Sequence, residues 1–206
     1  MTEERRTSVR PQGEWETQYA QQDVESMPWF YEPLDHDVER ALDRLGLTKG
    51  RILDLGTGPG TQAIALAKRG FDVTASDLSP TAVAKAEARA AKSGASVRFV
   101  ADDVLASRLE GPFDLVLDRG CFHTLPPERR GDYVATLARI VAPSGLAFLK
   151  TFSVKQPGEQ GPFRFSPEKI RELFEGPFDV RSIDETVYHG TLDPLPIALF
   201  TVLARR

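Results

Sequence analysis

The sequence predicts an α/β protein in which helices cover both faces of a doubly wound, mostly parallel β-sheet. Short apolar segments typical of strands alternate with helical patterns from Gly50 onward. The segment PFDLVLD, at residues 112–118, is apolar almost throughout, as expected for a strand covered on both faces. A turn with three glycines joins the first of these strands to the helix that follows it. Strands that alternate with helices form βαβ units with right-handed crossovers, which gives the predicted fold class.

The individual elements follow from local patterns. Residues 33–46 carry apolar side chains at helical spacing, and Gly46 suits the end of that helix. Ser79-Pro80 and Ser166-Pro167 each offer an N-cap oxygen and a proline preset for the first helical position. The predicted strands are residues 51–55, 71–77, 96–104, 112–118 and 146–152, with two closing strands at 178–188 and 196–205. The predicted helices are residues 33–46, 61–70, 80–94 and 126–141, and one that begins at Ser166-Pro167.

Length and charge restrict the class of protein. A chain of 206 residues suits one domain, which we divide into an N-terminal cap, residues 1–46, and a core, residues 47–206. The formal net charge of -4 argues against a nucleic-acid partner. Residues 1–16 lack the apolar stretch of a signal peptide, and no apolar run approaches the roughly 20 residues of a membrane span. With a single cysteine, Cys121, these features predict a cytoplasmic protein without a membrane partner.

The glycine turn, DLGTGPG at residues 54–60, is typical of a ligand-binding loop. Its three alternating glycines exceed what a plain strand-to-helix turn requires, which is the alternative interpretation. The third glycine comes one position too early for the G-x-G-x-x-G pattern of dinucleotide sites, and Thr61 stands where that pattern needs glycine. Asp54, two positions before the first glycine, suits a ligand with an ammonium group better than one with a pyrophosphate.

Acidic residues end the next two predicted strands. At the end of the second strand, Asp77 can accept hydrogen bonds from both hydroxyls of a ribose. At the end of the third, Asp103 can accept from an adenine amine while the backbone amide of Val104 meets a ring nitrogen. The alternatives are a capping role for Asp77, because Ser79-Pro80 follows it, and a plain loop role for Asp103.

Taken together, these residues resemble the class I S-adenosylmethionine (SAM)-dependent methyltransferases. The resemblance rests on LDLGTGPG, on Asp77 and on Asp103, and covers residues 50–150 at least. It implies a Rossmann-like sheet of seven strands whose last strand is antiparallel, with SAM as cofactor and S-adenosylhomocysteine as product. It also implies that Asp54 or the nearby backbone holds the amino group of the cofactor. The cofactor-binding residues predicted on this basis are Asp54, Gly56, Thr57, Gly58, Gly60, Asp77, Leu78, Asp103, Val104 and Asp118.

A narrower resemblance is to the small-molecule group that includes the thiopurine, tellurite-resistance and halide or thiol methyltransferases. It rests on WETQYAQQDVESMPWFYEP, on FDLVLDRGCFHTLPPERRGDYV and on GPFRFSPEKI. In that group an aromatic N-terminal segment folds over the site, and a D-R-G sequence after the fourth strand faces the reacting centre. Asp118, Arg119 and Gly120 match that sequence. The predicted catalytic residues are Asp118, Arg119 and His123, and the predicted substrate-binding residues are Trp29, Tyr31, Arg119 and Phe152.

The chemistry that this resemblance implies is an in-line displacement at a sulfonium, which depends mainly on positioning and exclusion of water. An anionic acceptor needs no base and could be attracted by Arg119, whose alternative role is an ion pair with Asp118 or Asp114. A phenol or an amine would need a base, for which His123 is the candidate. Cys121 is interpreted as a packing residue, and no metal site is predicted. Phe163 and Phe165 are expected to line the same pocket as Phe152.

The leading hypothesis is a methyltransferase for a small molecule, with a thiol, metalloid or halide acceptor ahead of oxygen or nitrogen. One alternative is an O- or N-methyltransferase of a small aromatic compound that uses His123 as base. The others are a nicotinamide-dependent oxidoreductase and a non-catalytic SAM-binding module. The N-P-P-Y-like sequence of enzymes that methylate bases or glutamine does not follow the fourth strand, where the chain reads DRGC. A monomer or a homodimer is expected.

Overall fold

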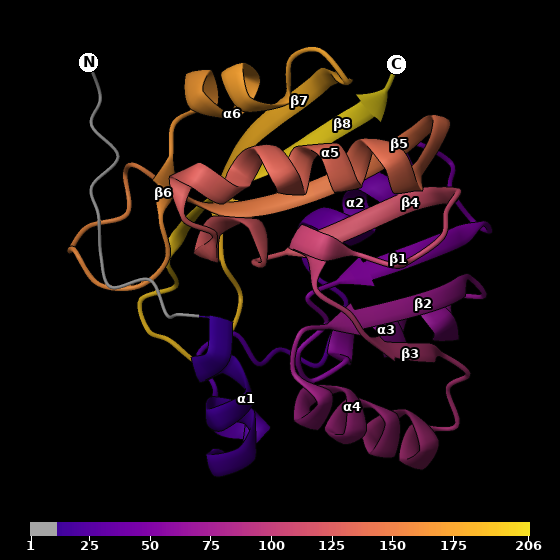
Figure 1. The fold of residues 1–206 in the computed structure, drawn as a ribbon. Helices are drawn as coiled ribbons and strands as arrows, with labels where there is room; N and C mark the ends of the chain where they lie inside the picture. The colour runs from indigo at the N-terminus through magenta and orange to yellow at the C-terminus, as the bar shows by residue number, and fades with distance from the viewer. Residues whose placement is uncertain (1–11) are drawn as a thin grey trace.

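The computed structural model describes residues 12–206, and the prediction about a signal peptide falls largely outside them. Its centre is a sheet whose strands follow the order β3-β2-β1-β4-β5-β8-β7 (Figure 1). All of these strands are parallel except β8, which runs antiparallel to both of its neighbours. The strands are β1 (Arg51–Leu55), β2 (Asp72–Asp77), β3 (Arg98–Ala101), β4 (Phe113–Arg119), β5 (Val141–Ser153), β7 (Phe178–Val187) and β8 (Ile197–Arg205). The predicted fold class is therefore confirmed.

The structure adds one strand that the sequence did not indicate. The two-residue β6 (Arg164–Phe165) pairs with the end of β5, so the described sheet has eight strands rather than seven. A second difference concerns residues 143–145, which separate the predicted helix 126–141 from the predicted strand 146–152 but lie within β5. Ser144 has a φ of 60° there, and the pairing between β4 and β5 shifts register at this place. Both differences are local and leave the strand order intact.

Helices cover both faces of the sheet (Figure 1). Helices α2 (His36–Arg44) and α3 (Thr61–Lys68) pack on one face, in a cluster that contains Leu42, Leu66 and Leu117. Helices α5 (Arg130–Ile140) and α6 (Pro167–Phe174) pack on the other, in a cluster that contains Val116 and Phe174. Neighbouring residues of β4 thus point to opposite clusters, which explains why that strand is apolar on both faces.

Capping residues begin and end the longest helix, α4 (Pro80–Ser93), as predicted. The Ser79 Oγ accepts from the Ala82 N–H at 3.0 Å, Pro80 occupies the first turn, and Gly94 ends the helix in the left-handed conformation. Helix α5 begins later than predicted, because residues 127–129 form a 3₁₀ turn. No helix in the described part of the chain has the length and apolar character needed to cross a membrane.

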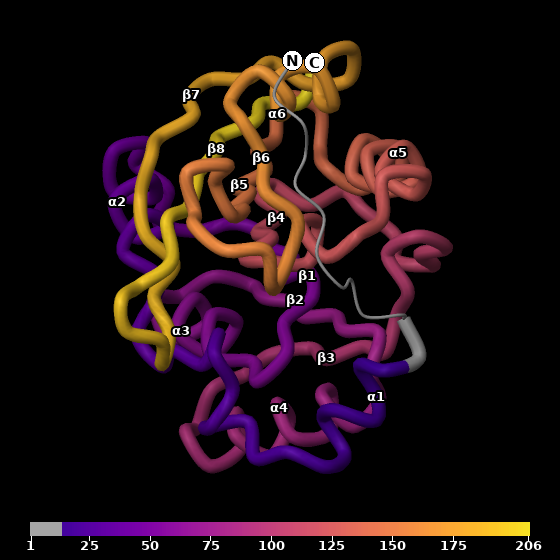
Figure 2. Tube along the Cα trace, turned by 90° about the vertical axis from the view of Figure 1, so that its left-hand side faces the viewer, coloured from indigo at the N-terminus to yellow at the C-terminus, as the bar shows by residue number. Residues whose placement is uncertain are grey.

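The N-terminal residues divide between two places. Helix α1 (Gln12–Gln21) lies beside α4, at the end of the molecule away from α6 (Figures 1 and 2). Helix α2 instead packs in the core, where Val38 and Leu42 are fully buried. The predicted division into a cap, residues 1–46, and a core, residues 47–206, stays a prediction, and the contacts of α2 favour a cap that ends before it.

Candidate functional site

The candidate site lies where the strand order reverses, between β1 and β4. In this register Leu55 at the end of β1 lies opposite Asp118 near the end of β4. Open α/β sheets bind ligands at the carboxyl ends of the strands at such a switch point. The glycine loop follows β1, and the D-R-G sequence follows β4, so the fold brings the two predicted motifs to one place.

The glycines of the loop are required by the packing of the chain against itself. Gly56, Gly58 and Gly60 have φ values of 69°, 51° and 77°, which favour glycine. A Cβ on Gly56 would lie 2.7 Å from that of Cys121, and a Cβ on Gly58 would lie 2.6 Å from the hydroxyl oxygen of Tyr19. The loop therefore lies directly under both the D-R-G segment and helix α1.

Asp54 is buried beneath this loop. Its Oδ2 accepts from the Thr57 hydroxyl at 2.5 Å. Burial raises the pKa of Asp54 to about 6, the nearby Asp118 adds to the rise, and the hydrogen bond from Thr57 opposes it. A cationic group of a bound ligand would stabilise the ionised form of this carboxyl group.

Asp77 ties the end of β2 to the glycine loop. Its Oδ2 accepts from the Gly58 N–H at 2.8 Å, and its Oδ1 accepts from the Ser79 N–H at 2.9 Å. The side chain is buried, and burial raises its pKa against these hydrogen bonds. Oδ1 of Asp77 thus has the capping role that was the alternative interpretation, and Oδ2 binds the glycine loop. Leu78, half-buried, follows it.

Asp103 and Val104 lie at the end of β3, one strand away from Asp77. Asp103 is half-buried, and its Oδ1 accepts from the Leu105 N–H at 2.9 Å, which begins a 3₁₀ turn at Val104. The Asp102 N–H donates to the Asp77 carbonyl at 2.9 Å. The carboxylates of Asp54, Asp77 and Asp103 therefore stand at the ends of three adjacent strands, β1, β2 and β3. Such a set suits a ligand rich in hydrogen-bond donors.

Asp118 organises the loop after β4. Its two oxygens accept four hydrogen bonds: from the Gly120, Cys121 and Phe122 N–H groups at 2.8–2.9 Å, and from the Tyr133 hydroxyl at 2.7 Å. Burial raises the pKa of Asp118 to about 6, and these donors oppose the rise. The carboxylate thus faces its own chain, an arrangement that favours a positioning role over the predicted catalytic and cofactor-binding roles.

Arg119 is also paired within the protein, an arrangement that disfavours its predicted catalytic and substrate-binding roles. Its Nε donates to Asp35 Oδ2 at 2.8 Å, and its other nitrogens donate to the carbonyls of Trp29, at 3.2 Å, and His189. Its ion-pair partner is thus Asp35 and not Asp118 or Asp114. Arg119 connects the N-terminal segment, the loop before β8 and the end of β4.

A buried charge cluster surrounds this connection, and sequence reasoning missed it. The Lys150 Nζ, on β5, lies 2.7 Å from both oxygens of Asp35 and 2.7 Å from Asp37 Oδ2. Lys150 and Asp35 are both fully buried. Burial would raise the pKa of Asp35, but the charges of Lys150 and Arg119 outweigh it and lower that pKa to about 2. A lysine within the apolar segment LAFLKTF was the available signal.

The predicted base, His123, has its acid–base chemistry blocked. Its Nδ1 accepts from the Phe152 N–H at 3.1 Å, so the proton of the neutral ring is on Nε2. Burial, together with the charge of Arg119, lowers the pKa of His123 to about 3. Nε2 already carries a proton, and the lone pair of Nδ1 is occupied by the hydrogen bond from the Phe152 N–H. Neither ring nitrogen is therefore free to accept a proton at neutral pH. This arrangement disfavours the predicted role of His123 as a general base.

The aromatic residues separate into three groups. Trp29 packs edge to face with Trp15 and Tyr19, at centroid distances of 5.8 and 6.4 Å, beside the glycine loop. Tyr31 instead lies with His36 and His189, stacking on His189 at 5.2 Å. The third group, at the end of β5, is Phe152, His123 and Tyr188. Of the predicted substrate-binding aromatics, Trp29 lies beside the glycine loop, Phe152 lies near the end of β5, and Tyr31 lies with the two histidines.

Phe163 and Phe165 differ from expectation as well. Both are buried in the core cluster of α5 and α6, where the Arg130 guanidinium lies 4.7 Å from each ring centroid. They therefore belong to the core and do not line a pocket with Phe152. Cys121 packs against Gly56, which agrees with its interpretation as a packing residue.

Helix α1 is held over the site by charged contacts. The Glu16 carboxylate accepts from the Ser79 hydroxyl at 2.5 Å and the Thr81 N–H at 3.2 Å, at the start of α4. In return, the Lys85 Nζ donates to the Tyr19 and Gln22 carbonyls at the end of α1. Each contact places a charge at the helix end that its sign favours.

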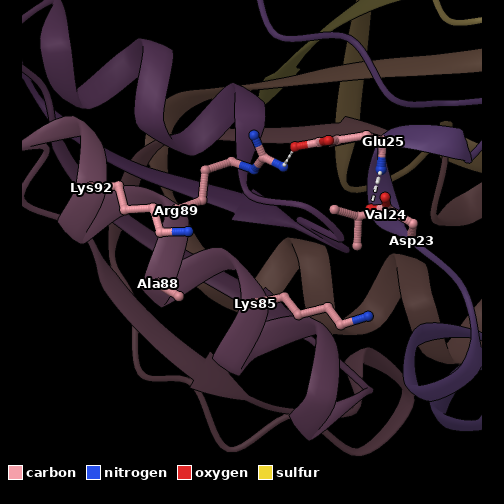
Figure 3. A pocket seen from close by; sticks show the side chains of 7 residues that line it. All are labelled: Asp23, Val24, Glu25, Lys85, Ala88, Arg89 and Lys92. Carbon is pink, nitrogen blue, oxygen red and sulfur yellow. Dashed lines mark hydrogen bonds and ion pairs between the residues drawn. The ribbon is translucent and has the colours of Figure 1, made fainter.

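A cavity of about 310 Å³ lies further along α4, against the 3₁₀ turn η1 (Val24–Ser26) (Figure 3). The Arg89 guanidinium in this cavity is paired with Glu25 and Glu32, and Lys85 is bound to carbonyls of α1. Its lining is therefore engaged in holding the N-terminal segment on α4. It is lined by Asp23, Val24, Glu25, Lys85, Ala88, Arg89 and Lys92.

Comparison with known proteins identifies the family. A family model described as "Methyltransferase domain" matches residues 52–145. The chain is 35% identical to an uncharacterized methyltransferase of Schizosaccharomyces pombe, over 54% of this chain and 78% of that protein. It is 30% identical to the 2-heptyl-1-hydroxyquinolin-4(1H)-one methyltransferase of Mycobacteroides abscessus, over 71% of this chain but less than two thirds, 66%, of that protein.

Solved structures agree. One, described as the conversion of a disulfide bond into a thioacetal group during echinomycin biosynthesis, is 27% identical with a TM-score of 0.81, covering 94% of this chain and 92% of that one. The 1,6-didemethyltoxoflavin-N1-methyltransferase of Burkholderia thailandensis, with bound S-adenosylhomocysteine, is 25% identical with a TM-score of 0.66, covering 82% of this chain and 77% of that one. The chain belongs to the class I SAM-dependent methyltransferases. SAM is its cofactor, and membership of this family overturns the nicotinamide alternative.

The residues present fit this cofactor. Its ammonium group, its two ribose hydroxyls and its adenine amine are all hydrogen-bond donors. The ends of β1, β2 and β3 offer only acceptors in Asp54, Asp77 and Asp103. A pyrophosphate would instead require donors or cations there, and Arg119, the nearby cation, is paired with Asp35.

Proposed function

We propose that this enzyme transfers the methyl group of SAM to the sulfur of a small thiol. The observation that carries the proposal is the engagement of the titratable side chains described around the D-R-G loop. Asp118 accepts four hydrogen bonds, Arg119 is paired with Asp35, and His123 has no basic nitrogen free. The Tyr188 hydroxyl donates to the Arg119 carbonyl. An acceptor that already ionises in solution, as a thiol does, needs no base from the enzyme.

The transfer requires little beyond alignment. The thiol loses its proton to solvent, and a lone pair of the thiolate sulfur forms a bond to the methyl carbon. The pair of the breaking carbon–sulfonium bond stays on the departing sulfur, which becomes a neutral thioether. The chain then has to hold the two reactants in line and keep water away. Helix α1 and Trp29, which lie beside the glycine loop, would supply the cover.

In this proposal, three carboxylates hold the cofactor. Asp54, with Thr57 and the backbone of Gly56, Gly58 and Gly60, faces the amino group. Asp77, followed by Leu78, faces the ribose hydroxyls, because its oxygens offer about four acceptor positions and the backbone N–H groups of Gly58, Ser79 and Leu78 do not occupy all of them. Asp103 receives the adenine amine, with the Val104 amide beside it. What supports these roles is the position of the residues at the ends of β1, β2 and β3.

A panel of acceptors tests the sulfur proposal. The protein is incubated with SAM and either thiophenol, hydrosulfide, iodide, tellurite, phenol or aniline, and release of S-adenosylhomocysteine is measured. We expect the highest kcat/KM with a thiol. A higher kcat/KM with phenol or aniline than with thiophenol would overturn the proposal. Absence of turnover with every acceptor, despite SAM binding, would favour the non-catalytic alternative. The similarity to a structure concerned with disulfide-to-thioacetal conversion supports sulfur.

O-methylation is the second candidate, because a relative 30% identical to this chain is named a 1-hydroxyquinolinone methyltransferase. This candidate has to manage without His123 as base, so it fits a hydroxyl that is itself acidic. A metalloid or halide acceptor would equally need no base. The proposal also retains four expectations from the sequence. They are a small-molecule acceptor, a location in the cytoplasm, no nucleic-acid partner, and a monomeric or homodimeric state.

Cofactor binding is expected to weaken at acidic pH through Asp54. Its pKa of about 6 means that its ionised form predominates only above that pH, and an ammonium group on the ligand stabilises the ionised form. Binding therefore releases a proton below pH 6, and the affinity for SAM should fall there by up to about tenfold per pH unit. Calorimetric titration between about pH 5 and about pH 8 measures this slope. In Asp54→Asn the slope should flatten, and an unchanged slope would exclude Asp54.

A further inference from the structure

We propose that His123 binds the methyl acceptor as a hydrogen-bond donor through its Nε2–H group and so selects acceptors whose reacting atom is anionic. The proposal rests on the thiol acceptor proposed above. It gives His123 a role opposite to that of a base, because the ring supplies a proton to a hydrogen bond and removes none.

The tautomer follows from one backbone contact. The Phe152 N–H points at Nδ1 of His123 at 3.1 Å, so Nδ1 is the acceptor and carries no proton. In a neutral imidazole the proton must then be on Nε2. No residue in the described part of the chain accepts a hydrogen bond from this Nε2–H. The Nε2–H group of His123, a side chain that is 4% exposed, is therefore a donor without a partner in this part of the chain.

The ring is held in one orientation. The Phe152 ring meets it edge-on at a centroid distance of 5.1 Å, and Tyr188 stacks on it at 5.7 Å. The His123 carbonyl accepts from the Phe163 N–H at 2.8 Å, which fixes the backbone. Nε2 lies beside Gly120, the last residue of the D-R-G sequence, where an added Cβ would come within 3.0 Å of it. The donor is thus presented at the end of β4, at the switch point.

The charge on the ring is also settled. Burial and the neighbouring Arg119 both disfavour the protonated form, so the ring is a neutral donor at neutral pH. A neutral donor stabilises a thiolate without forming a tight ion pair that would quench its nucleophilicity. As the methyl group is transferred, the negative charge on sulfur disappears and the hydrogen bond weakens. The contact therefore contributes more to the bound substrate than to the transition state, and its loss should appear in KM more than in kcat.

Two substitutions separate the two ring nitrogens. His123→Asn places an amide near Nδ1, which can accept from the Phe152 N–H, but it does not reach the position of Nε2. His123→Gln places an amide N–H near the position of Nε2. We expect His123→Asn to raise KM for thiophenol on the order of tenfold. Most of the decrease in kcat/KM should come from this rise in KM and less from a change in kcat. His123→Gln should recover most of the lost kcat/KM. SAM affinity and the midpoint of thermal unfolding, measured for both, show that the fold is intact.

The opposite pattern would overturn the proposal. His123 is a base if both variants lose kcat alike and if kcat of the wild type decreases as the pH is lowered past the pKa of free histidine. If both variants match the wild type in KM, His123 does not touch the acceptor. A base at His123 would also remove part of the support for the thiol acceptor, whereas unchanged KM values would leave that proposal intact. Turnover of the wild type with the acceptor panel tests the thiol chemistry separately.

A second measurement needs no variant to be active. In protein labelled with ¹⁵N at its three histidines, the nitrogen shifts report the tautomer of each ring, and His123→Asn assigns the signals of His123. We expect the Nε2–H tautomer at neutral pH, and a shift of this N–H when thiophenolate is added in the presence of S-adenosylhomocysteine. An Nδ1–H ring, or no response to thiophenolate, would refute the inference. A response without turnover of any thiol would retain the donor and reject the sulfur chemistry.

Discussion

Replacement of Lys150 by methionine should lower the free energy of unfolding by about 3–5 kcal/mol, the usual effect of breaking a buried ion pair by removing one partner. The Lys150 ammonium lies 2.7 Å from Asp35 and from Asp37 and is fully buried. Methionine fills similar space without charge. It leaves two buried carboxylates, with Arg119 paired to Asp35 and the exposed Arg40 paired to Asp37. Denaturant unfolding, monitored by tryptophan fluorescence, measures the change.

Lys155→Met is the matched control, because Lys155 is exposed and pairs with Glu185 on the surface, where such pairs contribute little. The pH dependence makes the test sharper. In the wild type the pKa of Asp35 is lowered to about 2, so its stabilisation is complete above about pH 4 and is lost as the pH falls toward 2. Without Lys150, burial favours the protonated carboxyls, so the deficit of the variant should shrink at acidic pH. A deficit that is independent of pH, or equal to that of Lys155→Met, would contradict this account.

Asp77→Asn is expected to weaken SAM binding on the order of 100-fold. Each carboxylate oxygen of Asp77 accepts from a backbone N–H, of Gly58 at 2.8 Å and of Ser79 at 2.9 Å. Asparagine has one acceptor oxygen, so its amide N–H₂ must face one of these donors and leave it unsatisfied. The substitution thus disturbs the glycine loop and also removes an acceptor proposed for the ribose. Two lost charge-assisted hydrogen bonds of about 1.5–3 kcal/mol each are enough for the expected change.

Asp72→Asn provides the control on the same strand. Asp72 begins β2, its side chain is largely exposed, and its contact with Arg51 is 4.0 Å long. The same change of charge and shape at that end of the strand should leave the affinity for SAM unaltered. Calorimetric titration of both variants decides the matter, because equal losses would show an effect of net charge and not of position.

The sequence by itself determined the sheet and most helix boundaries, and it placed the predicted cofactor-binding acids at the ends of adjacent strands. Those features depend on local patterns: apolar periodicity sets strands and helices, Ser79-Pro80 begins α4 through its own hydroxyl, and glycines appear where φ is positive. The alternation of strands and helices then places the ends of all parallel strands on one edge. For that reason Asp54, Asp77 and Asp103 could be assigned to one edge of the sheet without knowledge of any contact.

Only the tertiary structure decided what the polar residues after β4 do. The partner of Arg119 is Asp35, 84 positions away, and the partner of Lys150 is the same carboxylate, 115 positions away. His123 loses its basic nitrogen to the backbone of Phe152. A sequence shows which side chains can ionise, but the protonation state and availability of each depend on burial and on partners that the fold brings from distant segments. The positions of the acids at the strand ends could therefore be foreseen, and the partners of Asp118, Arg119, His123 and Lys150 could not.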